Sequence, residues 1–450
     1  MKTFYISFRV VPTDENDHYS TAEGAIAGCW IVEIDHLTAT TRASFLIARD
    51  AWSIQDIDTP AVEVTEDCFR DRDIGLEQFQ RAQKEGFAIF YAAWSKDKKS
   101  QYGPINLRQD TQFNIGDFLN KQKKLKRRGR CLHFAANDEC NEFTNAHSIQ
   151  RGQSLTNIAI NGHVYTLSAK YSSIKKSKVR PSIEKESINK VSTFYGFCKK
   201  HDNELFAPID NALLSPTDEQ IVLYSYRSLC RELFVKQNSY EHLISQEKTT
   251  RHNRAIKDLF EAFTTGTKNG LENLRRHKAC YDKCLKDRSY LDIRYVLFSS
   301  KQPPVICFSG LIYPHFDFMG RQLQDLGSPS SKNELITFCS APMATGWGYL
   351  FAWHKDSSSI CVEFMKSLAT AAYNGADLGD LLFRFIILNC ENFAISPRWW
   401  ESFPENDKEM ILNHAALGAS PFSVIKSTYL LEGLAGVSKW KFETVLSEME

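Results

Sequence analysis

The chain has 450 residues, with 55 Lys and Arg against 54 Asp and Glu and therefore a net charge of +1. Charged residues make up 24% and hydrophobic residues 43%, a composition that excludes a disordered, collagen-like or coiled-coil chain. The apolar stretches fall short of the roughly 20 residues of a membrane-spanning helix, and residues 1–10 lack the apolar core of a signal peptide. We therefore expect a cytoplasmic protein of about three domains that does not contact a membrane.

The first 95 residues alternate between strand-like and helix-like patterns. The predicted strands are 4–11, 25–34, 52–57, 61–64 and 87–94, and the predicted helices are 36–49 and 73–85. After the first strand, the order β-α-β-β-α-β matches the split βαβ arrangement of a ferredoxin-like fold. We therefore expect residues 1–95 to form a ferredoxin-like α/β sandwich.

Positive charge is concentrated in one part of the chain. Residues 121–201 carry 17 Lys and Arg and only 5 Asp and Glu, a local net charge of +12. Within this part, seven of the ten residues at 121–130 are basic and none is acidic. The run is either the solvated end of a linker spanning 96–130 or an arm that contacts phosphate groups.

Four soft or borderline metal ligands stand in two pairs in the basic region. Cys131 and Cys140 form the first pair, and Cys198 and His201 form the second, in a Cys-x-x-His spacing. Zinc prefers four such ligands in a tetrahedron, which favours a structural zinc site. The first pair is separated by eight residues, more than in a common zinc knuckle, and buried thiols with unrelated histidines are the alternative.

This segment resembles the HNH, or ββα-metal, nuclease family, in which a zinc-stabilised treble clef carries a hairpin with the catalytic histidine. The stretch at 146–149, Ala-His-Ser-Ile, matches the family's Asp-His motif. The resemblance implies that His147 is the general base, Asn161 the hairpin-loop asparagine and Asp202 the last catalytic residue, with Asn203 as its alternative. It also implies structural Zn²⁺ at the four ligands and catalytic Mg²⁺ or Mn²⁺. It covers about 75 of the 450 residues.

The chain departs from the family pattern at two of these positions. Ala146 replaces the acid that usually orients the base, and Asp202 stands where the family has His or Asn. His147 is therefore a base, a zinc ligand or a structural histidine, and Asn161-Gly162 is equally explained as a hairpin turn. The stretches around His147, His163 and Cys198 together also resemble a family of bacterial proteins of uncharacterised activity.

The remainder of the chain reads as helices followed by mixed structure. Helical spacing runs from 218 to about 285, where Cys280 and Cys284 are expected to pack rather than to bind metal. Four tryptophans of the last part, which line either a pocket or the core, are Trp347, Trp353, Trp399 and Trp400. The predicted strands are 292–299, 305–313, 335–340 and 346–354, and the predicted helices are 361–373, 378–388, 407–415 and 421–434.

We expect a multidomain α+β protein. Its predicted parts are a ferredoxin-like domain (1–95), a basic linker (96–130), a treble-clef-like zinc module (131–212), a helical region (213–290) and a C-terminal α+β domain (291–450). The expected function is that of a metal-dependent HNH endonuclease, a hydrolase of phosphodiester bonds in DNA or RNA with a role in bacterial antiviral defence. The alternative is a non-catalytic zinc module that binds nucleic acid or a partner protein.

Overall fold

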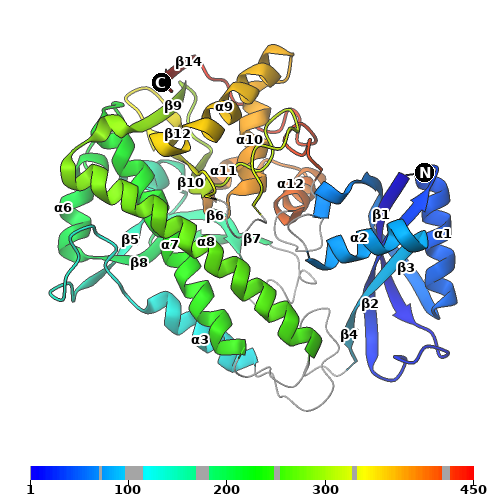
Figure 1. Cartoon of the computed structure of the whole chain (residues 1–450). Helices are drawn as coiled ribbons and strands as arrows, with labels where there is room; N and C mark the ends of the chain where they lie inside the picture. Colours follow the sequence, from blue (N-terminus) through cyan, green and yellow to red (C-terminus); the bar gives the residue numbers. More distant parts are fainter. Residues whose placement is uncertain are drawn as a thin grey trace. The chain divides into compact units, whose positions relative to one another are not determined.

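The computed structural model describes residues 2–69, 73–96, 115–168, 182–247, 254–326, 332–417 and 426–449. The chain divides into two compact units, the first consisting of Met1–Leu119, Leu243–Thr264 and Pro421–Lys426 and the second of the remaining residues. The predicted boundaries after residues 212 and 290 both fall inside the second unit. The predicted zinc module and most of the helical and C-terminal regions therefore belong to one compact unit (Figure 1).

The first unit is built on a four-stranded antiparallel sheet with strand order β3-β1-β2-β4. Its elements are β1 (Lys2–Pro12), β2 (Ala22–Glu33), α1 (His36–Arg49), β3 (Trp52–Val64), η1 (Glu66–Phe69), α2 (Asp73–Glu85) and β4 (Phe87–Ser95). Helix α1 begins at Asp35, whose side chain accepts a hydrogen bond from Thr38 N at 2.8 Å and so satisfies an otherwise unpaired N–H.

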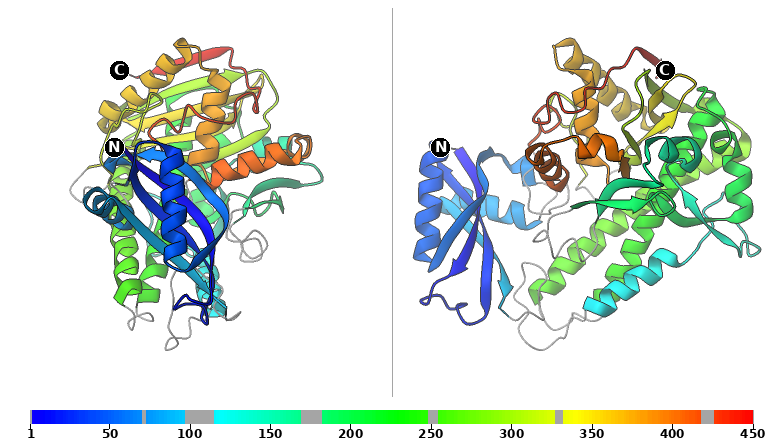
Figure 2. Two further views of the ribbon diagram at one scale, coloured as in Figure 1. Left: turned by 90° about the vertical axis from the view of Figure 1, so that its right-hand side faces the viewer. Right: turned by 180° about the vertical axis from the view of Figure 1, so that it is seen from behind.

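The two helices cover opposite faces of this sheet. Alternate residues of β1 such as Phe4 and Ile6 pack with Ala43 of α1, whereas Tyr5 belongs to a separate cluster with Phe79 of α2. Successive side chains of a strand point to opposite faces, so a central strand that is buried on both sides needs a helix on each. The right-hand view of Figure 2 shows the strands between α1 and α2.

This arrangement corrects the ferredoxin-like prediction for residues 1–95. The strands predicted at 52–57 and 61–64 form one strand, β3. The register of its pairing with β1 shifts next to Pro60, so this proline lies at a β-bulge and does not end the strand. Proline is tolerated there because β3 is an edge strand and its missing N–H need not bond a neighbour. The prediction that this region contains both helices and strands is confirmed. After β1, however, its main elements run β-α-β-α-β and no longer match the β-α-β-β-α-β order of the ferredoxin-like fold.

The second unit contains an eight-stranded antiparallel sheet and a separate two-stranded one formed by β5 (Phe143–His147) and β8 (Thr193–Cys198). In spatial order the strands of the large sheet are β14 (Thr444–Glu448), β9 (Ile293–Ser300), β12 (Trp347–His354), β11 (Ile336–Pro342), β10 (Ile306–Ile312), β13 (Phe393–Ile395), β6 (His163–Ser168) and β7 (Ser182–Ser187). Strands β9 to β12 confirm the four strands predicted in the C-terminal part. Strands β6 and β7, which fall within the predicted zinc module, extend the same sheet.

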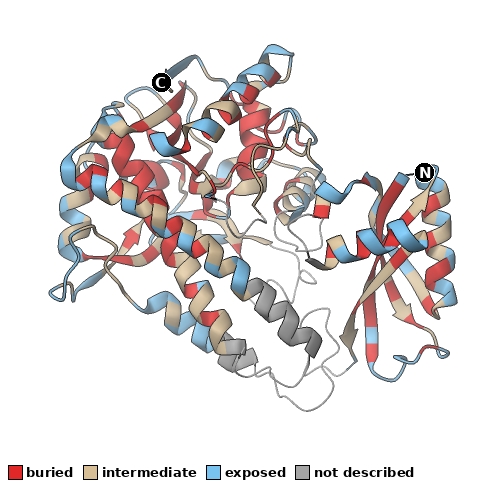
Figure 3. Ribbon diagram, in the orientation of Figure 1, coloured by how far each residue is buried: buried red, intermediate tan, exposed pale blue. Residues whose placement is uncertain are grey.

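Helices cover both faces of the large sheet. On β12, Trp347 and Trp353 belong to one core cluster with Phe364 of α9 (Ser358–Tyr373). Leu350 belongs to another cluster with Tyr281 of α8 (Arg254–Asp287). Buried residues accordingly run along the strands and along the inner sides of the helices (Figure 3). Trp347, Trp353 and Trp400 are buried in one core cluster and Trp399 packs against that cluster, so these tryptophans belong to the core.

Not all helices of this unit are expected from the sequence: the pattern predicts helical stretches at 218–285, 361–373, 378–388 and 407–415, but not at Ile115–Arg127, Lys199–Asp210 or Pro397–Glu401. The helices are α3 (Ile115–Arg127), η2 (Arg151–Leu155), α4 (Thr156–Ile158), α6 (Lys199–Asp210), α7 (Asp218–Glu247), α8 (Arg254–Asp287), η3 (Tyr290–Asp292), η4 (Lys355–Ser357), α9 (Ser358–Tyr373), α10 (Leu378–Asn389), α11 (Pro397–Glu401) and α12 (Glu405–Leu417), of which α3, α7 and α8 also reach into the first unit. Helix α3 lies within the predicted linker, whose residues 97–114 fall outside the described part of the chain.

The helix predicted at 421–434 is wrong over its described residues. Residues 426–434 form turns, and Leu434 has a φ of +53°. Leu430 and Leu434 are nevertheless buried at the helical spacing that suggested the prediction. The guanidinium of Arg384 donates hydrogen bonds to the carbonyl oxygens of Leu430 and Gly433, so these backbone groups are satisfied without a helix.

Candidate functional site

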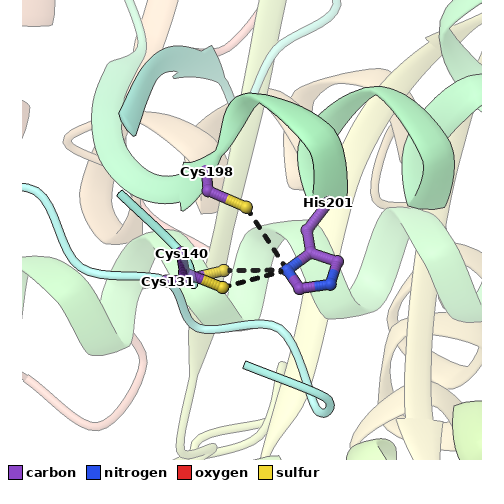
Figure 4. Close-up of side chains that lie close together, drawn as sticks. All are labelled: Cys131, Cys140, Cys198 and His201. Carbon is purple, nitrogen blue, oxygen red and sulfur yellow. Dashed lines mark hydrogen bonds between the residues drawn. The ribbon is translucent and has the colours of Figure 1, made fainter. Parts of the chain in front are cut away.

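Cys131, Cys140, Cys198 and His201 converge into one cluster, as the sequence predicts (Figure 4). The three Sγ atoms lie 3.4, 3.4 and 3.3 Å from His201 Nδ1. A tetrahedral ion with thiolate sulfur at about 2.3 Å and imidazole nitrogen at about 2.05 Å has a sulfur–nitrogen edge of about 3.6 Å. The donor set and the spacing therefore fit a metal ion held by three cysteines and Nδ1 of one histidine.

The second ligand pair is positioned by the start of a helix. Cys198 ends β8 (Thr193–Cys198) and is the N-cap residue of α6, and His201 lies in the first turn. Residues three positions apart in a helical turn lie on one side of it, so Cys-x-x-His directs both ligands to the same point. This pair behaves as its spacing predicts.

Backbone pairing explains why the first ligand pair works at its unusual separation. Leu132 N donates to Gly196 O at 2.8 Å, which places Cys131 beside the end of β8. Lys199 N donates to Glu142 O at 2.7 Å, which brings the chain near Cys140 to the start of α6. Between these anchors, turns closed by the carbonyls of His133 and Asn137 take up the extra residues.

One neighbour of this cluster was missed by the sequence reasoning. The ring of His133 stacks on that of His201, with centroids 4.0 Å apart and planes 5° apart. Nδ1 of His133 accepts a hydrogen bond from Ala135 N at 3.0 Å, which fixes the stacking ring. His133 thereby limits rotation of His201. Its position two residues after Cys131 was the available signal.

His147 stands outside the four-residue cluster. It is the last residue of β5 (Phe143–His147), which pairs with β8. Its Nε2 lies 3.0 Å from Ile188 O, and because a carbonyl only accepts, Nε2 carries the proton and Nδ1 the lone pair. Burial lowers the pKa of His147, and the nearby charges of Arg151 and Arg227 act in the same direction. The side chain is half-buried and neutral near pH 7.

Arg227 of α7 and Asp210 of α6 lie near enough to His147 to act on its pKa, and Asp202 lies near the same two residues. Arg227 is 4% exposed and donates to both carboxylate oxygens of Asp210, at 2.7 and 2.6 Å. Asp202 is half-buried; burial raises its pKa to about 6, and Asp210 adds to the rise while Arg227 opposes it. Arg227 and Asp210 belong to no motif of the sequence analysis. They are found only because α6 and α7 pack together.

Asn161 precedes Gly162, whose carbonyl accepts a hydrogen bond from Ile188 N at 3.0 Å, while Ile188 O faces His147 Nε2. Asn161 occupies an exposed turn with a φ of +51°, followed by Gly162 at +70°, and the backbones of Ile160 and His163 pair across it. Among the described residues, hydrogen bonds join Asn161 to His163, whose Nδ1 lies 2.7 Å from Asn161 O, and not to His147. The turn interpretation of Asn161-Gly162 accounts for what is observed.

The basic run at 121–130 forms the end of α3 and the stretch after it. Arg128 and Arg130 are engaged by α7, where both guanidinium groups bind the carboxylate of Glu241 at 3.1 and 3.3 Å. The other exposed basic residues of the run are Lys121, Lys123, Lys124, Lys126 and Arg127. The run is thus divided between structural arginines and exposed cations.

No family model matches the chain, and neither the curated proteins nor the solved structures searched contain a match. Among the described helices, none combines the length and the apolar character needed to cross a bilayer. The site must therefore be interpreted from its own geometry.

Proposed function

We propose that residues 131–212 carry a treble-clef zinc module of HNH type and that the protein is a metal-dependent nuclease with His147 as its general base. The observation that supports this most is the placement of His147. It ends the first strand of the β5-β8 pair, lies outside the Cys131, Cys140, Cys198 and His201 cluster, and has its Nε2 held by a backbone carbonyl. A histidine that served as the fourth zinc ligand would have lain inside that cluster.

The cluster itself would hold zinc. Three cysteine sulfurs and one imidazole nitrogen are a borderline-soft donor set, which Zn²⁺ prefers over Mg²⁺ or Ca²⁺. Four protein ligands leave no open position, so this zinc would be structural. It would join the 131–140 segment to the start of α6 and so hold β5, with His147, in place.

His147 has the properties that a general base requires. Its neutral form keeps the Nδ1 lone pair available to take a proton from water, while Nε2–H donates to Ile188 O and fixes the ring. The lowered pKa keeps this form populated at neutral pH. In this chain the Ile188 carbonyl orients the base, so the absence of an acid at Ala146 is compensated.

The proposed catalytic ion would bind at Asp202. The Asp202 carboxylate is the metal ligand that the HNH-like motif supplies for this ion. A single carboxylate suits Mg²⁺, which is commonly held by one or two carboxylates together with substrate phosphate and water. When bound, the ion supplies Lewis acidity to the phosphoryl group and charge stabilisation to the leaving oxygen. Arg151, which is exposed and near His147, would bind a neighbouring phosphate.

One observation favours the alternative of a non-catalytic zinc module. Among the described residues, the groups able to hold a metal ion do not include Asp202 or His147. A module that only binds nucleic acid or a protein needs the zinc cluster and the exposed cations but no second ion. Activity measurements separate the two proposals.

The decisive experiment compares His147→Ala with His163→Ala, since His163 is an exposed histidine on β6, a strand of the large sheet. Nicking of DNA or RNA in Mg²⁺ or Mn²⁺ should fall by about 10²–10⁴ in the first variant and remain in the second. Both should keep their zinc and their nucleic-acid affinity. Equal activity of the two variants, or loss of zinc from His147→Ala, would refute the assignment of the base.

A further inference from the structure

A second group of potential metal ligands lies on the other side of the large sheet from α9 and α10. Cys284 of α8, Asp292 of η3 and His354 at the end of β12 place one ligand atom each within 4.8 Å of one another. Cys284 is 1% exposed and His354 7%, and the Asp292 side chain is 33% exposed. Three elements that are distant in sequence thus bring sulfur, nitrogen and oxygen donors to one partly buried point.

We propose that Cys284, Asp292 and His354 bind a second metal ion, a zinc ion by the chemistry of its donors. A thiolate, an imidazole and a carboxylate are all common zinc ligands, and a site with three protein ligands keeps a fourth position for water. This site shares no residue with the Cys131, Cys140, Cys198 and His201 cluster. It is also independent of the proposed nuclease function.

The surroundings of His354 fit a metal-bound histidine. Its Nδ1 accepts a hydrogen bond from Asp356 N at 3.2 Å and lies 3.4 Å from the Asp356 carboxylate. A histidine that binds metal through one ring nitrogen usually donates its other N–H to a carboxylate. With Nε2 bound to the ion, Nδ1 carries the proton and donates to Asp356. Without an ion, Nδ1 can instead accept from the backbone N–H.

The charges at this point also balance around a divalent cation. Lys355 Nζ binds one carboxylate oxygen of Asp292 at 2.7 Å and leaves the other oxygen for an ion. On binding, the Cys284 thiol releases its proton to solvent. The thiolate and the carboxylates of Asp292 and Asp356 then offset the two charges of the ion and the charge of Lys355. Cys280, one helical turn before Cys284, forms with His354 and Asp356 another set of donor atoms within 4.8 Å of one another, but Cys280 is only half-buried and Asp356 is exposed.

Such an ion would join α8 to the beginning of β9 and the end of β12. The chain between α8 and β9 is short, and η3 within it contains the proposed ligand Asp292. The prediction that Cys280 and Cys284 only pack holds for the burial of Cys284, which belongs to the core cluster under α7 and α8. Packing alone does not explain why a carboxylate and an imidazole converge on its sulfur.

Cobalt substitution tests the proposal, because Co²⁺ occupies zinc sites and gives a thiolate-to-metal charge-transfer band. Co²⁺ is added in excess to the full-length protein and to the variants Cys284→Ser and Cys307→Ser, the latter removing a buried thiol outside both clusters. We expect Cys307→Ser to match the wild type and Cys284→Ser to lose the part of the band that belongs to this site. Identical bands in all three proteins would overturn the proposal.

A second pair of variants keeps the test valid if Cys284→Ser does not fold. Asp292→Asn removes a partly exposed ligand, and Asp287→Asn removes a nearby exposed carboxylate from the end of α8. The proposal requires that Asp292→Asn lowers the zinc content of the purified protein, or its Co²⁺ affinity, relative to Asp287→Asn. Equal metal binding by these two variants would contradict it.

Discussion

Cys198 Sγ lies 3.3 Å from His201 Nδ1, and the two residues are the N-cap and a first-turn residue of the same helix, α6. The start of this helix therefore supplies half of a four-ligand cluster, while its later residues Phe206 and Asp210 contact Arg227 of α7. Through α6, the ligand cluster is connected to the hydrophobic core beneath α7 and α8. A change at the cluster should consequently affect the stability of more than its own loop.

The first prediction concerns the metal. Cys198→Ser should remove one equivalent of zinc from the purified protein, because serine is a much weaker ligand than thiolate for this ion. It should also lower the melting temperature, since binding free energy of structural zinc contributes to folding. Elemental analysis and thermal unfolding measure both effects.

The matched control is Cys68→Ser, a cysteine of the first unit that belongs to neither ligand group. Its Sγ contacts Thr65, and a serine hydroxyl can take over that contact. This variant should keep the full zinc content. If Cys198→Ser binds as much zinc as Cys68→Ser, the four-ligand assignment is wrong.

Local sequence patterns predicted the ligands whose relative positions are set within one short segment of the chain. Cys198 and His201 are fixed relative to each other by one helical turn, and the spacing was sufficient to identify them. The position of Cys140 depends on the Lys199–Glu142 backbone contact, which links segments far apart in the chain. Its ligand role followed from residue type and not from spacing.

Tertiary contacts account for the errors. In the sequence, Pro60 suggests the end of a strand. Because β3 lies at the edge of the sheet, the strand continues past this proline with a bulge. Leu430 and Leu434 have helical spacing, but Arg384 satisfies the backbone of a turn instead. The pairing of β6 with β13 joins residues more than two hundred positions apart, and no pattern within the zinc-module segment indicates it.

The second prediction concerns the basic run. Replacing the exposed Lys121, Lys123, Lys124 and Arg127 by serine should weaken nucleic-acid binding and flatten its salt dependence. Each lost phosphate contact reduces the slope of log K against log salt by about 0.9 on duplex DNA. Fluorescence anisotropy at several salt concentrations measures both quantities.

The control for the basic run is an arginine whose side chain makes contacts within the folded protein. Arg130 binds Glu241 and Gln237 and lies over the ring of Phe234 at 5.0 Å. Arg130→Ala should lower the free energy of unfolding by about 1–2 kcal/mol and leave the salt slope nearly unchanged. If the serine variant binds as well as the wild type at low salt, the run is only a solvated surface.

The third prediction is an asymmetry in the Arg227–Asp210 pair. Arg227 is 4% exposed and Asp210 is 41% exposed, so removing the acid leaves a buried cation without its partner. Asp210→Asn should therefore reduce the free energy of unfolding by about 1–3 kcal/mol. Arg227→Met should cost less, because the exposed carboxylate remains hydrated and methionine fills much of the space over Phe206. Urea unfolding of both variants provides the comparison, and a larger loss for Arg227→Met would contradict this account.

The fourth prediction is the pH dependence of His147. Burial lowers its pKa, so the folded protein holds this imidazole neutral at pH values where the unfolded chain, near the ordinary value of about 6.5, already binds a proton. Its contribution to stability is therefore complete above about pH 6.5 and is lost as the pH falls toward the folded pKa. His147→Gln, which cannot be protonated, should make unfolding less sensitive to pH across this range. If the base assignment is right, the acidic limb of kcat/KM should also lie below the ordinary histidine value. NMR titration of the His147 ring tests the pKa directly and without any activity, and a value at or above the ordinary histidine value of about 6.5 would refute the prediction.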